Sequence, residues 1–149
     1  MSLDIAKTFE ALLDKNNNIA YKALQALRKE SEETDRVYPY MDRLSDMLDN
    51  DNSYIRTRGL TLLAYNAKWD KDNKIDEIID KYLKYITDVK PITARQCIKL
   101  LPFIAKHKPE LKNDILAALS KVDLCTYDDS MQPLIYKDIQ KALEEIHKL

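Results

Sequence analysis

The chain of 149 residues contains a single glycine, Gly59. Average usage near 7% would give a chain of this length about ten. Hairpin turns and phosphate-binding loops depend on glycine, because they need positive φ angles or a close approach of the backbone to a ligand. The scarcity of glycine therefore argues against most all-β folds, P-loop enzymes and dinucleotide-binding folds, and it favours an all-helical chain.

Apolar residues recur with helical spacing along the chain. Between Lys74 and Thr87 they form one stripe on a 3.6-residue helix, made of Ile75, Ile78, Ile79, Tyr82, Leu83 and Ile86. Shorter stripes predict three more helices of this kind, and a polar break and a second helix follow each of the four. Asn, Asp and Pro supply the breaks, since they favour turns and helix starts. We therefore predict one domain, 1–149, built from helix pairs at roughly 2–31, 36–69, 74–107 and 109–148.

The second pair carries the most specific pattern. Residues 41–48 form an apolar helix, residues 49–52 read Asp-Asn-Asp-Asn, and Ile55-Arg56-x-x-Gly59-Leu60 follows. This stretch resembles a HEAT repeat, in which Val-Arg-x-x-Ala follows an Asp/Asn-rich turn. The resemblance implies a right-handed α-α superhelix of about four HEAT-like pairs, with an armadillo-like architecture. It also implies that Asp51 and Arg56 bond to one another and to neighbouring repeats, and that Gly59 fills a slot where two helices approach closely.

The register of the third pair has two solutions. Arg95 aligns with Arg58 at a spacing of 37 residues, or with Arg56 at a spacing of 39 residues. Both spacings suit a repeat of paired helices, so the choice stays open.

Charge is distributed unevenly, although the net charge is -1. The second helices of the two middle pairs, 53–69 and 92–107, contain six Arg and Lys residues and no Asp or Glu. In HEAT proteins the second helices line the concave surface, so the resemblance implies a basic inner face. Separately, helical periodicity places Arg58 and Thr61 on the side of the helix 53–69 that faces away from the core. The candidate partner-binding residues are Lys22, Arg58, Tyr65, Arg95, Lys99, Lys137 and Lys141. The alternative is that these residues are ordinary solvated helix positions, or that they form Asp–Arg bonds between repeats.

Patterns for catalysis or metal binding are weak. His107 and His147 end predicted helices, where a cation offsets the helix dipole. Cys97 lies in an apolar run and Cys125 has no neighbouring base, so neither is marked as a nucleophile. Two acidic stretches begin like calcium loops but lack the glycine and the bidentate glutamate. We expect no metal site, no cofactor and no enzymatic activity.

The sequence also lacks the patterns of secretion and of membrane insertion. Its first residues do not form a basic and apolar secretory signal, and no run approaches the roughly 18 apolar residues of a membrane helix. We therefore expect a cytoplasmic protein that makes no membrane contact.

These observations predict a non-catalytic protein-interaction scaffold or adaptor, which binds a partner on the concave face of the second helices. If charge drives the binding, the partner is acidic. The alternative function is nucleic-acid binding on a basic concave face, as in the HEAT-like glycosylases of alkylated DNA, which this chain resembles in architecture alone. A subunit that assists an enzyme, as in the phycobilin lyases, is a third class. The partner and the oligomeric state stay open.

Overall fold

The computed structural model describes residues 2–149, and this part of the chain contains eight α-helices and no strand. The all-helical prediction is therefore confirmed. The first helices of the four pairs are α1 (Ile5–Ala11), α3 (Met41–Met47), α5 (Lys74–Leu83) and α7 (Lys112–Ser120). The second helices are α2 (Asn17–Glu33), α4 (Ser53–Tyr65), α6 (Pro91–His107) and α8 (Gln132–His147).

Several predicted boundaries need correction. Helix α2 continues to Glu33, past the predicted end of the first pair at residue 31. The predicted helices 53–69 and 74–87 change into 3-10 helices before they end, at η2 (Ala67–Trp69) and η3 (Lys84–Thr87). Three further 3-10 helices connect elements: η1 (Tyr38–Tyr40), η4 (Pro109–Leu111) and η5 (Leu124–Thr126). Tighter 3-10 turns are common at helix ends, and apolar periodicity does not reveal them.

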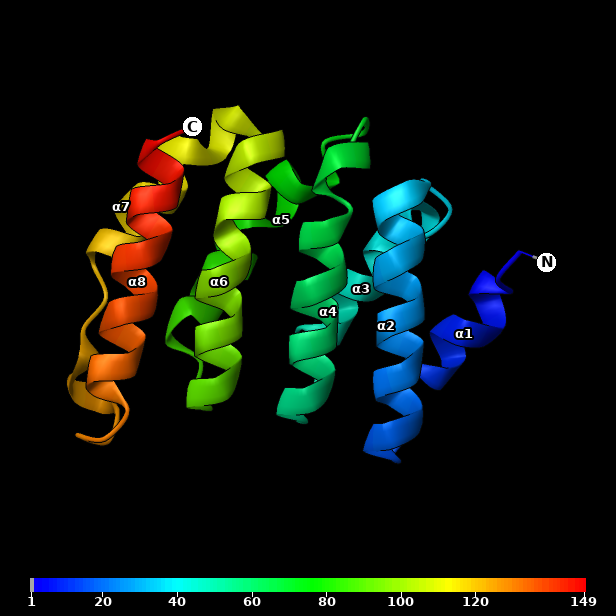
Figure 1. Ribbon diagram of the computed structural model, residues 1–149, viewed down its shortest axis with the longest axis horizontal. Coiled ribbons are helices and arrows are strands. Elements are labelled where there is room, and N and C mark those ends of the chain that lie inside the picture. Colours follow the sequence, from blue (N-terminus) through cyan, green and yellow to red (C-terminus); the bar gives the residue numbers. More distant parts are fainter. Residues whose placement is uncertain (1) are drawn as a thin grey trace.

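The helices form two layers (Figure 1). The even-numbered helices α2, α4, α6 and α8 stand side by side in one row, and each packs against the next. All four begin at the same edge of the row, the lower edge in Figure 1. The shorter helices α3, α5 and α7 lie behind the row, and α1 lies beside α2 at the N-terminal end. The row therefore gathers four helix N-termini along one side of the molecule.

Asparagine and proline start these helices, as the sequence predicts. The Asn16 side chain accepts from the backbone of Asn18 and Ile19 at the start of α2, and Asn52 accepts from the backbone of Tyr54 at the start of α4. Pro91 lies in the first turn of α6, where no amide donor is needed.

Gly59 lies where α3 and α4 pack closely together. A Cβ atom at this position would come within 3.0 Å of the Leu44 carbonyl oxygen and of the Met47 Cβ. Real Cβ atoms are rarely this close to backbone atoms, so a larger residue would push the two helices apart. The predicted small-residue slot is therefore confirmed.

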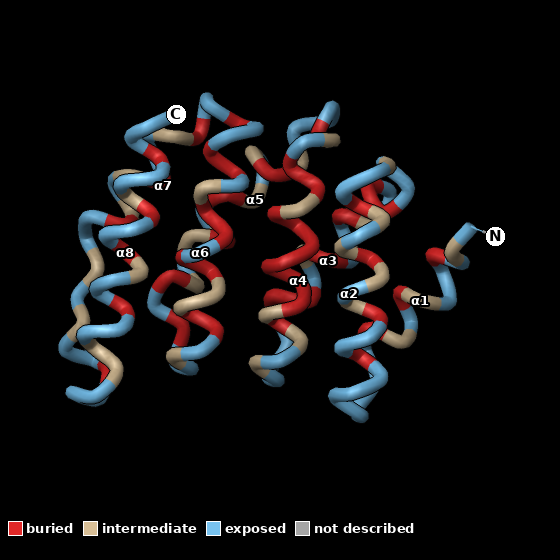
Figure 2. Tube along the Cα trace, in the orientation of Figure 1, coloured by how far each residue is buried: buried red, intermediate tan, exposed pale blue. Residues whose placement is uncertain are grey.

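Helix α4 is the most deeply buried of the even-numbered helices (Figure 2). It packs against α2 on one side, α6 on the other and α3 behind. Arg58 and Thr61, which the periodicity places on the outward side, are both buried. The expectation was wrong because the helical wheel assumes one covered face, whereas neighbours cover α4 from three directions.

No helix of residues 2–149 combines the length and the apolar character that a membrane crossing requires.

Candidate binding groove

A groove of about 650 Å³ lies on the even-numbered helices, between α2, α4 and the start of α6. We call it the α2–α4–α6 groove. Its lining includes three cationic side chains and three large apolar or aromatic ones: Arg28, Arg58, Lys90, Tyr21, Tyr54 and Ile92. No Asp or Glu belongs to this lining in the part of the chain that the structure describes. The volume is in the range of sites that bind small molecules or a few side chains.

Arg58 is the most deeply placed of the three cations, with 6% of its surface exposed. Its Nη1 donates to the backbone carbonyl of Leu12 at 3.0 Å, and its Nη2 donates to Oδ1 of Asn17 at 3.1 Å. Both partners are neutral: Leu12 follows the last residue of α1, and Asn17 is the first residue of α2. Burial lowers the pKa of the Arg58 guanidinium from its ordinary value, because the charged form loses hydration.

Arg28 belongs to a polar and aromatic chain of contacts across three helices. Its Nη1 donates to Oε1 of Gln25 at 3.0 Å, and its Nη2 donates to the Tyr65 hydroxyl at 2.6 Å. Gln25 in turn donates to the Tyr21 hydroxyl at 2.8 Å. The Tyr65 ring stacks on Phe103 of α6, with 5.2 Å between ring centres. These contacts hold Arg28 in place without any carboxylate.

The rim of the groove is apolar and exposed. Tyr21 is 58% exposed, Tyr54 60% and Ile92 77%. Below them, Thr57 and Thr93 join α4 to α6 through a hydroxyl contact of 2.9 Å. Isolated exposed apolar residues are ordinary, but here three of them surround a cationic groove. The groove therefore offers both charged and apolar contacts to a ligand.

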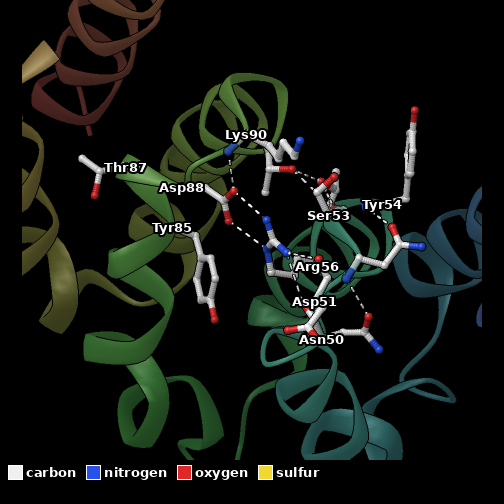
Figure 3. A network of polar contacts seen from close by, with 12 residues as sticks. Asn50, Asp51, Ser53, Tyr54, Arg56, Tyr85, Thr87, Asp88 and Lys90 are labelled. Atoms are coloured by element: carbon white, nitrogen blue, oxygen red, sulfur yellow. Dashed lines mark hydrogen bonds and ion pairs between the residues drawn. The ribbon is translucent and has the colours of Figure 1, made fainter. Parts of the chain in front are cut away.

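A second polar network lies between consecutive pairs, at the turns before α4 and α6 (Figure 3). Arg56 donates from Nε and Nη2 to the two carboxylate oxygens of Asp88, at 2.9 and 2.7 Å. Its Nη1 donates to the backbone carbonyls of Asn50 and Asp51, at 3.1 and 2.9 Å. The hydrogen bond to Asp88 raises the pKa of Arg56.

The expected contact between Arg56 and the turn 49–52 is thus confirmed. The acceptor on Asp51 is its backbone carbonyl, and the carboxylate partner is Asp88 of the following pair. This network ties one helix pair to the next.

The structure separates the seven predicted partner-binding residues into three groups. Four lysines are exposed on the even-numbered helices: Lys22, Lys99, Lys137 and Lys141. Arg95 and Tyr65 are half-buried, and both already have hydrogen-bond partners within the chain: Arg95 donates to Asp138 at 2.6 Å, and Tyr65 accepts from Arg28. Arg58 alone of the seven belongs to the groove lining, and it is buried rather than outward-facing.

Of the six lining residues named above, the sequence analysis missed five: Tyr21, Arg28, Tyr54, Lys90 and Ile92. Tyr54 and Ile92 had a usable signal, since each is the second residue of its helix and lies off the buried stripe. Arg28 and Lys90 had none, because a cation at a helix end or on a helix side is common on any solvated surface.

Other reactive side chains lie outside the groove. Cys97 is buried, and burial raises the pKa of its thiol, while Cys125 is exposed. Across residues 2–149, no three His, Cys, Asp or Glu side chains gather in a way that could hold a metal ion.

In comparisons with known proteins, no family model, no curated protein and no solved structure matches this chain.

Proposed function

We propose that this chain is a HEAT-like α-solenoid, a right-handed superhelix of four helix pairs, and that it is a non-catalytic scaffold for a protein partner. The partner binds along the even-numbered helices. The single observation that carries the proposal is the α2–α4–α6 groove, where exposed Tyr54 and Ile92 adjoin buried Arg58.

The repeat architecture is supported by bonds that recur between pairs. Thr57 contacts Thr93 at a sequence separation of 36, and Arg28 donates to Tyr65 at a separation of 37. Tyr127 donates to the backbone carbonyl of Asp88 at a separation of 39. Contacts at nearly constant separation are typical of repeat proteins, in which each unit packs against its neighbours.

A protein partner has more support than a nucleic acid. A nucleic-acid interface requires several accessible cations that follow a phosphate backbone. Here Arg58 is buried and Arg95 is paired with Asp138, so the exposed cations of the predicted set are four scattered lysines, on a chain with a net charge of -1. Exposed aromatic and aliphatic side chains next to arginine are instead typical of protein interfaces.

The test is a selection of a displayed library of random peptides against the protein, followed by NMR mapping of the resynthesised peptides. We expect shifts concentrated on α2, α4 and the start of α6. Ile92→Ser should weaken binding about ten-fold or more, since it removes apolar contact area. Lys84→Glu, an exposed change on η3 outside the groove, is the matched control and should leave affinity unchanged.

Two outcomes would overturn the proposal. Selected peptides that map to the odd-numbered helices would refute the assigned surface. Micromolar binding of a labelled duplex or single-stranded oligonucleotide to the same helices, with no selected peptide bound there, would favour the nucleic-acid alternative.

A further inference from the structure

The groove contains the one buried cation of residues 2–149 that has no carboxylate partner. Elsewhere in residues 2–149, two other cations are buried, Arg56 and Lys108. Arg56 is paired with Asp88, and Lys108 lies within 3.3 Å of carboxylate oxygens of Asp70, Asp76 and Glu110. Arg58 by contrast donates to neutral oxygens only. The charge of Arg58 is therefore uncompensated by the chain itself.

An uncompensated buried cation favours an external anion. Removing a charge from water costs free energy, and a bound carboxylate with direct hydrogen bonds offsets that cost. Arg28 and Lys90 add two positive charges to the same lining. The first residues of α2, α4 and α6 also line the groove, since all three helices begin at the same edge of the row (Figure 1). The positive ends of their helix dipoles add to the attraction for an anion.

The rim selects among anions. An inorganic phosphate would satisfy the arginines but would leave Tyr54 and Ile92 exposed to water. A peptide that carries a carboxylate beside an apolar side chain satisfies both, because it pairs with the cations and covers the rim. Burial of such an apolar side chain contributes favourably to binding in proportion to the area removed from water. The chemistry of the groove therefore fits an acidic segment with apolar residues.

We propose that the α2–α4–α6 groove binds an acidic peptide segment of a partner protein, in which Glu or Asp side chains pair with Arg58 and with Arg28 and an adjacent apolar side chain packs on Tyr54 and Ile92. This inference rests on the proposed scaffold function and specifies the partner of that same surface. It also assigns Arg58 a role that the buried stripe of α4 does not require.

The experiment uses the full chain and the peptides selected from the random library. We expect Asp or Glu next to an apolar residue in the selected sequences. For each resynthesised peptide, an analogue with Asn or Gln in place of Asp or Glu should bind about ten-fold more weakly or worse. Affinity should also fall with added salt, because dissolved ions screen the attraction between the acidic peptide and the cations of the groove.

The charge-removing variants are Arg28→Gln and Arg58→Gln. Each should weaken the acidic peptide about ten-fold or more and leave the carboxamide analogue nearly unchanged. If Arg58→Gln does not fold, Arg28→Gln still decides the result, because Arg28 lies at the side of α2 and is half-buried. Lys99→Gln is the matched control, since Lys99 is exposed on α6 outside the groove lining.

The outcomes separate this inference from the scaffold function. Neutral selected peptides that map to the groove, or equal affinities for the acidic peptide and its analogue, would overturn the acidic partner and leave the scaffold function standing. Selected peptides that map elsewhere would overturn both. Inorganic phosphate or a single-stranded oligonucleotide that binds as tightly as the peptide, and loses affinity in Arg28→Gln, would replace the acidic segment with a phosphate ligand.

Discussion

Arg56 and Arg58 lie two residues apart on α4 and are almost equally buried, at 8% and 6% exposed, yet their surroundings are opposite. Arg56 meets both oxygens of the Asp88 carboxylate, which raises its pKa. Arg58 meets a backbone carbonyl and an amide oxygen, and burial lowers its pKa. Two residues of one type on one helix thus belong to two different regions.

The difference follows from what the neighbouring turns supply. The turn before α6 places Asp88 against Arg56, so in this region a carboxylate of one helix pair neutralises the cation of the preceding pair (Figure 3). The end of α1 and the start of α2 offer Arg58 only the Leu12 carbonyl and the Asn17 side-chain oxygen, and Arg58 lines the α2–α4–α6 groove. A paired buried arginine is structural, whereas an unpaired one adjoining a groove can bind a ligand. Four changes can break or sharpen this comparison.

The largest effect is expected for Arg56→Met. This variant leaves the Asp88 carboxylate buried without its cation, so the free energy of unfolding should fall by about 3–5 kcal/mol. Urea denaturation measures the change. The double variant Arg56→Met, Asp88→Leu should recover part of the loss, because no buried charge then stays unpaired. A loss below about 1 kcal/mol in the single variant would show that the Arg56–Asp88 pair contributes no more than an ordinary exposed ion pair.

Arg58→Met should cost less, about 1–3 kcal/mol. It removes donors to Leu12 and Asn17, but it leaves no buried charge without a partner. Urea denaturation under the conditions used for Arg56→Met compares the two directly. Equal or greater destabilisation by Arg58→Met would contradict the view that the two arginines differ in kind.

The Asp88 region should also lose stability at alkaline pH. The Tyr127 hydroxyl donates to the Asp88 carbonyl at 2.6 Å, and burial raises the pKa of Tyr127 to about 12. An unfolded tyrosine ionises near its ordinary pKa of 10. The stabilisation is therefore complete below pH 10 and is lost as the pH rises from about 10 to 12, by about 1–2 kcal/mol.

Tyr127→Phe tests this pH dependence. Denaturation curves between pH 9 and 12 should show a shallower alkaline loss than the native chain. Part of the loss should persist, because burial also raises the pKa of Tyr38 to about 12. Identical alkaline slopes for the two chains would show that Tyr127 ionises with equal ease in both states.

The smallest effect is expected for Arg95→Gln. Arg95 pairs with Asp138 between α6 and α8, but its side chain is 27% exposed, so water already solvates the guanidinium in part. The free energy of unfolding should fall by about 1 kcal/mol or less. Thermal and urea denaturation both measure it. A loss as large as that of Arg56→Met would show that partial exposure does not weaken this pair.

The local part of the fold was predictable. Apolar stripes such as that of Lys74–Thr87 depend on neighbours three and four residues away, so they identify helices without knowledge of the fold. The caps at Asn16 and Asn52 and the proline at Pro91 are equally local. Even the contact of Arg56 with the preceding turn was within reach, because its acceptors lie five and six residues away.

The candidate site was much less predictable. Of the seven residues proposed from helical wheels, Arg58 alone lies in the groove, and the wheel placed it on the wrong side of α4. The groove forms from residues about 36 to 46 positions apart, and neither composition nor periodicity reports such separations.

The sequence by itself determined that this chain is helical, where α2, α4 and α6 begin, and that Gly59 is needed where two helices meet. These features are set by local backbone preferences and by the spacing of apolar residues. Only the tertiary structure decided which arginine received a carboxylate. Asp88 and Arg56 are 32 residues apart, and Leu12 and Arg58 are 46 apart. Pairing over such distances depends on how the helices pack, and packing placed a carboxylate beside Arg56 and only neutral oxygens beside Arg58.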